Sequence, residues 1–170
     1  MRILILCLLV FLAFPAFGED AKTLTWDDLL PEGEAERLEQ LWAQDTFLLH
    51  DTPEGGYYDS TPVQIGTFNV VKELAGQRVR IPGFVLPFEY SESGEISEFL
   101  LVPYFGACIH SPPPPPNQIV YVTAEAPMPL GKEWQPIWAI GTMRTTNHYN
   151  DLGDAAYTLE IDEWDVYDGY

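Results

Sequence analysis

The sequence is short of basic residues, of histidine and of cysteine, and these shortages exclude several classes of function. Eight Lys and Arg stand against 26 Asp and Glu, which gives a formal net charge of −18 at pH 7. Such a surface repels phosphate backbones and anionic lipid headgroups, so nucleic-acid binding is excluded first. The sequence also has no glycine-rich loop that could cradle a phosphate and no Gly-x-Ser-x-Gly elbow of a serine hydrolase.

The N-terminus has the three parts of a secretory signal. A short positive start at Arg2 is followed by an unbroken apolar run, residues 3–14, and by small residues at Ala16 and Gly18. This order is typical of a signal peptide at residues 1–18 that is cleaved after Gly18. We therefore expect the mature chain in the periplasm or an equivalent oxidising space. The apolar run is shorter than the ~20 residues that span a bilayer, so no stable membrane insertion is expected after cleavage.

Cleavage would also remove Cys7, which leaves Cys108 as the lone cysteine. A lipoprotein anchored through Cys7 is the alternative, but this residue lies inside the apolar run. A single thiol cannot form an internal disulfide, so a function of Cys108 would be that of a ligand, a nucleophile or an intermolecular partner. The mature length fits one domain. We predict an N-terminal helical segment at residues 19–54 and a β-barrel domain at residues 55–170.

The first residues after the signal favour helix. Thr25 can cap a turn over residues 26–30, which Pro31 ends. A second, amphipathic segment at residues 34–44 places three apolar residues on one face, namely Leu38, Leu41 and Trp42. We predict one or two N-terminal helices that cover one side or one open end of a β core.

Beyond Gly55, short apolar segments alternate with Gly, Pro and polar turns. The predicted strands are residues 63–71 (with a bulge at Gly66), 77–81, 84–90, 96–104, 119–123, 137–142 and 157–161. Residues 74–85 combine a Leu-x-Gly turn with an alternating strand that Gly83 can bend, which is typical of the first strand of an OB-type barrel. The sequence therefore predicts a mostly β protein with a small OB-like β-barrel.

The most unusual stretch is residues 106–118. Cys108 and His110 are two apart, so in an extended segment their side chains project from the same face. A thiolate and an imidazole together suit zinc or copper, and a third ligand is needed. His50, His148 and many carboxylates are available, and we take His148 as the third candidate. A buried structural Cys108 and a catalytic thiol are the alternatives; the thiol ranks last because neighbours in i, i+2 register are poorly placed for proton transfer.

Five consecutive prolines, residues 112–116, follow the Cys-x-His pair. They cannot join a sheet, because each lacks an N–H, and they favour a stiff polyproline II loop. Tyr104, Phe105 and Tyr121 could pack against this loop. We favour a rigid lid that holds Cys108 and His110 over a recognition motif for a partner's aromatic groove.

With Gly-Ala-Cys-Ile-His at residues 106–110, the proline run and Asn117-Gln118, the chain resembles an uncharacterised exported proteobacterial family, a domain of unknown function. The resemblance includes residues 25–30 and 76–85. It implies genomic proximity to ABC-type transporter components and to exported metal-handling proteins, and hence a periplasmic accessory role. A group of exported β-barrel proteins tied to zinc supply is similar in layout, but it has adjacent cysteines in place of the Cys-x-His pair.

We therefore expect a non-enzymatic periplasmic accessory or binding protein. Cys108, His110 and His148 would bind a transition metal, with zinc favoured, and envelope or ABC transporter components would be the partners. The alternative is an interaction module of the cell envelope that uses the polyproline loop. A thiol-dependent enzyme or redox partner is a third hypothesis.

Overall fold

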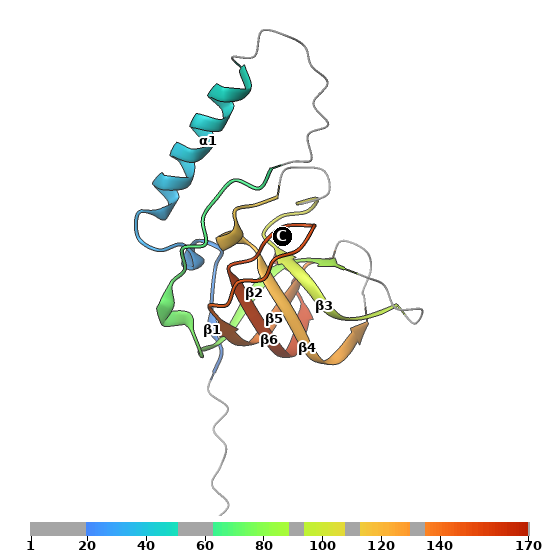
Figure 1. Ribbon diagram of the computed structural model, residues 1–170. Coiled ribbons are helices and arrows are strands. Elements are labelled where there is room, and N and C mark those ends of the chain that lie inside the picture. The colour runs from blue at the N-terminus through green and yellow to red at the C-terminus, as the bar shows by residue number, and fades with distance from the viewer. Residues whose placement is uncertain (1–19, 51–62, 89–93, 108–112, 130–134, 170) are drawn as a thin grey trace, which may run out of the picture.

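The computed structural model describes residues 20–50, 63–88, 94–107, 113–129 and 135–169, with the side chains of residues 45–50 left out (Figure 1). Its elements are β1 (Lys22–Thr23), the 3-10 turn η1 (Asp27–Leu29), α1 (Glu34–His50), η2 (Lys72–Leu74), β2 (Arg78–Pro87), β3 (Glu95–Val102), η3 (Pro116–Gln118), β4 (Val120–Pro129), β5 (Ile137–Arg144) and β6 (Tyr157–Val166). The protein is mostly β with a single α-helix near the N-terminus, within the prediction of one or two.

Five strands form a closed barrel. The strand order is β2-β3-β4-β6-β5, and β5 pairs back with β2. The pairing of β4 with β6 is parallel, while the other four barrel pairings are antiparallel. A five-stranded barrel with this crossover is OB-like, which confirms the predicted fold class.

Strand β2 serves both halves of the barrel. Its residues from Arg78 to Gly83 pair with β5, and those from Phe84 to Pro87 pair with β3. At the changeover, a Cβ on Gly83 would lie 2.7 Å from the Leu101 Cγ, so a side chain cannot fit there. The predicted glycine bend is therefore present, and the two strands predicted on either side of it are one continuous strand.

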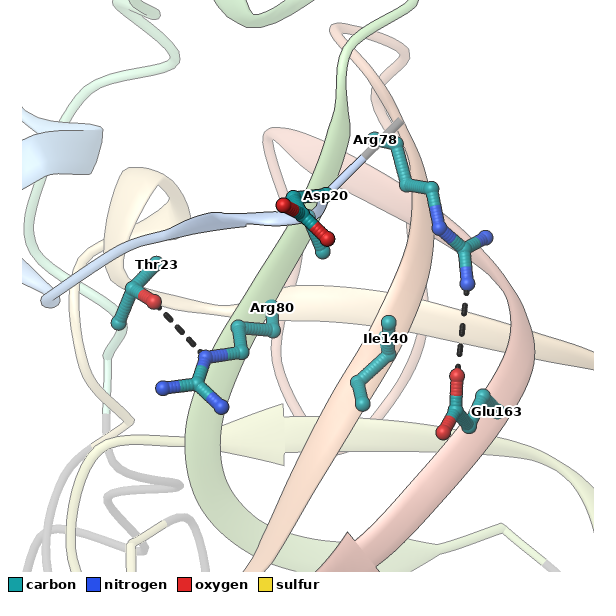
Figure 2. A pocket seen from close by; sticks show the side chains of 7 residues that line it. Asp20, Thr23, Arg78, Arg80, Ile140 and Glu163 are labelled. Atoms are coloured by element: carbon teal, nitrogen blue, oxygen red, sulfur yellow. Dashed lines mark hydrogen bonds and ion pairs between the residues drawn. The ribbon is translucent and has the colours of Figure 1, made fainter. Parts of the chain in front are cut away.

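The N-terminal segment covers the part of β2 that β3 does not reach. Leu24 donates its N–H to the Arg80 carbonyl oxygen (2.9 Å), and the Trp26 indole N–H donates to the Pro82 oxygen (2.8 Å). Thr23 Oγ1 accepts a hydrogen bond from Arg80 Nε at 2.8 Å (Figure 2). Leu24 and Leu29 are buried in the barrel core. At about 1.5–3 kcal/mol for each fully buried leucine, this burial holds the segment against the barrel.

The prediction of a strand at residues 63–71 is wrong. This segment has no ladder partner, because closure of the barrel already pairs the strands with one another. Gly66 marks a close approach rather than a bulge: a Cβ there would lie 2.6 Å from Pro115 Cβ. The segment instead packs along the end of the proline run.

The turn after Thr25 is shorter than predicted, and Thr25 does not cap it. Trp26 takes the cap position of the 3-10 turn and makes no side-chain capping bond. The Asp28 carboxylate accepts hydrogen bonds from the Thr25 N–H and hydroxyl, both at 2.7 Å. These two bonds hold the pKa of Asp28 below its usual value.

Helix α1 is longer than predicted, and it does not cover the barrel. It begins at Glu34 as expected but continues to His50 and projects away from the strands (Figure 1). Leu38 in its second turn is buried, whereas Trp42 one turn later is 47% exposed. The predicted apolar face is therefore used only near the start of the helix, where tertiary contacts are available.

Two features of the prediction lie outside the described residues. The signal peptide and the boundaries after residues 18 and 54 fall there and stay predictions. Within the described part of the chain, no helix is long and apolar enough to cross a membrane.

Candidate functional site

A second, small hydrophobic cluster lies on the outer face of β2 and β3. Three residues of these strands alternate with residues of the barrel interior and are nevertheless buried, namely Leu86 of β2 together with Leu100 and Val102 of β3. Because alternate residues of a strand face opposite sides, these side chains need a cover outside the barrel. Three residues from connecting segments supply it, namely Ala107, Ile119 and Ala155.

His148 lies beside this cluster in the loop after β5. Its backbone exchanges two hydrogen bonds with Ala155, both at 2.8 Å. Its half-buried ring stacks on Tyr121 of β4 with 3.6 Å between the ring centroids and 3° between the planes. Phe88 packs near both rings, with its centroid 6.2 Å from that of His148. The imidazole orientation is thus set by two aromatic rings and by a backbone bridge.

Neither ring nitrogen of His148 bonds to a protein group among the residues that the structure describes. The contacts of this side chain there are the two aromatic rings. A neutral imidazole offers one lone pair to a metal ion or a proton. The stacked ring is therefore oriented while its nitrogens stay available.

Tyr121 is itself held from the other end. Burial and, next, a hydrogen bond to the Glu98 carboxylate raise the pKa of Tyr121 to about 12. The hydroxyl therefore keeps its proton well above neutral pH. Because Tyr121 belongs to barrel strand β4, it gives His148 a support in the barrel wall.

The described residues on either side of the Cys-x-His pair are connected to the loop that carries His148 through a shared hydrophobic cluster and through Gln64. Ala107, directly before Cys108, is 2% exposed and shares the outer cluster with Ala155. At the other end, Gln64 Nε2 donates to the carbonyl oxygens of Pro114 (2.8 Å) and Asp154 (2.9 Å), and Gln64 Oε1 accepts from the Asp154 N–H. The residues on either side of 108–112 are thus both connected to the loop at residues 148–155.

The three predicted ligands differ in how far the structure describes them. Cys108 and His110 lie outside the described residues, as does the side chain of His50, so the ligand set stays a prediction. His148 is described, and it is half-buried beside the segment's anchors. Within the described residues no three His, Cys, Asp or Glu side chains come together as a metal site. A metal site at His148 would therefore need ligands from outside the described residues.

The end of the proline run is buried. Residues 114–116 and Asn117 are enclosed, which disfavours docking of a partner's groove on these prolines. Gln118 Nε2 donates to the Trp26 carbonyl oxygen at 2.9 Å. The Asn-Gln end of the motif therefore ties the proline run to the N-terminal segment.

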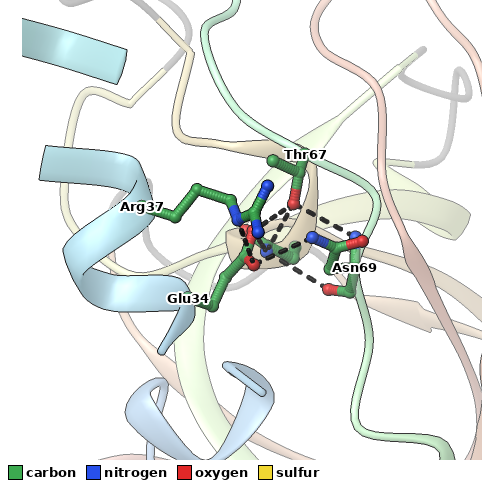
Figure 3. Close-up of polar contacts among 5 residues, drawn as sticks. Glu34, Arg37, Thr67 and Asn69 are labelled. Carbon is green, nitrogen blue, oxygen red and sulfur yellow. Dashed lines mark hydrogen bonds and ion pairs between the residues drawn. The ribbon is translucent and has the colours of Figure 1, made fainter. Parts of the chain in front are cut away.

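Asn117 joins a buried polar network around Glu34, the first residue of α1. Figure 3 shows Glu34 with Arg37, Thr67 and Asn69. The Glu34 carboxylate, 3% exposed, accepts from the Thr67 hydroxyl, from Asn69 Nδ2 (2.9 Å) and from Asn117 Nδ2 (3.3 Å). Arg37 Nε lies 3.7 Å from the same carboxylate. The network compensates the cost of burying a charged group and fixes the start of α1 against the proline run.

Sequence reasoning missed the residues that support His148 and the helix. Gln64, Glu98 and Glu34 are ordinary polar residues in the chain, and no spacing or motif marks them. Glu34 carries the usual signal of an acidic residue in a first helical turn. Its burial follows from residues 67–69 and 117, which are distant in the sequence.

Comparisons with known proteins agree on the family. Residues 26–166 match the family described as "Protein of unknown function (DUF3299)". The chain is also similar to the crystal structure of a DUF3299 family protein from Pseudomonas aeruginosa PAO1, with 33% sequence identity and a TM-score of 0.67. That alignment covers 89% of this chain and 99% of the other. A search of the curated proteins gave no match.

Proposed function

Since the chain belongs to the DUF3299 family, a domain of unknown function as the sequence resemblance implied, we propose a function from its own residues. The protein is a non-enzymatic, periplasmic accessory protein that binds a transition metal, with zinc favoured. Cys108, His110 and His148 are the ligands. The metal-loaded protein serves an ABC-type transport system or another envelope component.

The observation that carries this proposal is the placement of His148. Its ring is held flat on Tyr121 with both nitrogens unbonded in the described part of the chain. Its loop shares a hydrophobic cluster with Ala107 and is bridged by Gln64 to Pro114, the described residues on either side of the Cys-x-His pair. An imidazole held in one orientation loses little conformational entropy when it binds a metal ion, which favours His148 as a ligand.

The chemistry of the three side chains suits zinc. One thiolate and two imidazoles match the donor types that zinc prefers, and a fourth position would stay open for water or for a ligand of a partner. The π face of Tyr121 lies against the imidazole and favours the partial positive charge that a bound cation induces on that ring. The net charge of −18 raises the local concentration of cations around the protein.

The test is metal analysis of protein purified from the periplasm. We expect stoichiometric zinc in the natural protein and its loss in Cys108→Ala, His110→Ala and His148→Ala. His50→Ala is the matched control, because it removes a histidine outside the proposed set and should keep its zinc. Loading with Co²⁺ gives a second readout, since a charge-transfer band in the near ultraviolet reports a thiolate ligand.

Two results would overturn the proposal. Unchanged zinc in Cys108→Ala would remove the thiolate from the set and leave a structural cysteine. Zinc lost in His50→Ala but kept in His148→Ala would replace the third ligand. The same preparation tests export, because the chain should begin at Glu19 by mass spectrometry.

A further inference from the structure

A groove of about 520 Å³ lies on the outer face of the barrel, over β1, β2, β5 and β6 (Figure 2). One row of register partners crosses it, from Thr23 to Arg80 to Ile140 to Glu163. The other lining residues are Asp20, Ala21 and Arg78. None of these residues belongs to the cluster around His148, so the groove is a separate surface.

Arg80 is the unusual residue of the groove. Its guanidinium lies 4.4 Å from the centroid of the Trp138 ring, and its Nε donates to Thr23 Oγ1 at 2.8 Å. These two contacts fix the direction of the guanidinium plane. Within the described residues its two terminal nitrogens have no carboxylate within 4.0 Å, so their N–H groups face the groove without a partner.

The other arginines that the structure describes are neutralised. Arg78 pairs with Asp162 and with Glu163 (3.5 Å), Arg144 pairs with Glu160 at 2.8 Å, and Arg37 lies near Glu34. In a chain with a net charge of −18, an oriented arginine without a carboxylate is therefore an exception. A guanidinium held in one plane is the group that best recognises a carboxylate, through two parallel hydrogen bonds.

The opposite charge is present in the same groove. Asp20 is exposed and has no partner in the described part of the chain, whereas Glu163 is shared with Arg78. Ala21 and Ile140 provide apolar surface among these charged groups. The acidic neighbours disfavour phosphates and other multiply charged anions, because like charges would lie close together.

We propose that this groove binds a small zwitterion, an amino acid or a short peptide. The carboxylate of the ligand pairs with Arg80, its ammonium group lies at Asp20, and an aliphatic side chain contacts Ile140. Such a ligand gives both free charges a partner and leaves the net charge of the complex unchanged.

The test uses the dipeptide alanyl-leucine and free leucine as probes, titrated into ¹⁵N-labelled protein. We expect shifts of the amide signals of residues 20–23, 78–80 and 140, and saturation in the millimolar range typical of a few polar contacts. Blocking the peptide's carboxylate as an amide should weaken binding by about tenfold or more, as should Arg80→Gln. Arg144→Gln is the matched control and should bind as the natural protein does.

Asp20→Asn tests the proposed contact of the ligand's ammonium group separately from the contact of its carboxylate with Arg80. It should weaken binding of alanyl-leucine but leave binding of its N-acetyl form unchanged. Because Asp20 is exposed and precedes the paired residues of β1, we expect this variant to fold as the natural protein does. If neither probe shifts these signals up to saturating concentrations, or if Arg80→Gln and Arg144→Gln bind alike, the proposal is wrong. Zinc content should not change in any of these variants.

Discussion

The hydroxyl of Tyr157 donates a hydrogen bond to the Leu29 carbonyl oxygen at 2.7 Å and so joins the last barrel strand to the N-terminal turn. The Tyr157 hydroxyl oxygen in turn accepts a hydrogen bond from the Val71 N–H at 2.7 Å. Tyr157 is fully buried. One side chain of β6 therefore fixes two connecting segments over the barrel.

Tyr157→Phe should destabilise the protein by about 1–3 kcal/mol, because it leaves the Leu29 oxygen and the Val71 N–H without their partner. The measurement is the free energy of unfolding from urea titration. Tyr149→Phe is the control: this ring is 67% exposed, so the change should stay within about 0.5 kcal/mol. Equal effects of the two substitutions would show that the buried hydroxyl contributes nothing.

Stability should fall as the pH rises from about 10 to about 12. Burial raises the pKa of Tyr157 to about 12, and burial with the Glu98 hydrogen bond does the same for Tyr121. The folded chain thus holds these protons at pH values where the unfolded chain loses them, so the stabilisation is complete below pH 10 and is lost toward pH 12. Urea titrations across this range measure it. In Tyr157→Phe the fall should be shallower; an unchanged slope would contradict the assignment to Tyr157.

Gly141→Ala should prevent folding or destabilise the barrel by more than about 4 kcal/mol. Its Cβ would overlap the Glu160 carbonyl oxygen and lie 2.6 Å from Ile161 Cα, at the irregular register of β5 and β6. Gly76→Ala is the control, since a Cβ there meets open space and costs only the left-handed backbone (φ 79°), about 1–2 kcal/mol. Circular dichroism and urea titration compare the two. If the Gly141→Ala protein were as stable as Gly76→Ala, strands β5 and β6 could move apart at this position without loss of stability.

Glu34→Gln should cost about 1–3 kcal/mol, because an amide nitrogen would replace a carboxylate oxygen that faces only donors. Glu36→Gln is the control. Glu36 lies in the same helical turn and is exposed, so this substitution should change stability by less than about 0.5 kcal/mol. Thermal unfolding of both variants measures the difference. If Glu34→Gln left the stability unchanged, the helix start would be held by apolar contacts such as those of Leu38.

The strands and the glycine bend could be predicted because their signals are local. Alternation of Val79 and Ile81 with arginines is read along one strand, and Gly83 interrupts it where the barrel requires a curl. The segment at residues 63–71 looks similar in sequence, yet it is not a strand. Its hydrogen-bonding groups turn to residues such as Tyr157, which no local pattern reveals.

The candidate site divides in the same way. The sequence singled out His148 only because histidine is scarce; its stack on Tyr121 and the support from Glu98 come from three different strands or loops. The roles of Arg78 and Arg80 are likewise not visible in an alternating strand. Neighbours across the sheet pair Arg78 with two carboxylates, whereas the neighbour that Arg80 contacts is Thr23.

By itself, the sequence determined the acidic character and the β class, and it predicted the export signal and the metal ligands, because each depends on composition or on neighbours along the chain. The tertiary structure alone decided the closure of the barrel, the burial of Glu34 and the bridge from Gln64 to Asp154. Gln64 and Asp154 are 90 positions apart in the sequence. Contacts over such separations exist only after the barrel has closed, since until then nothing brings their partners together.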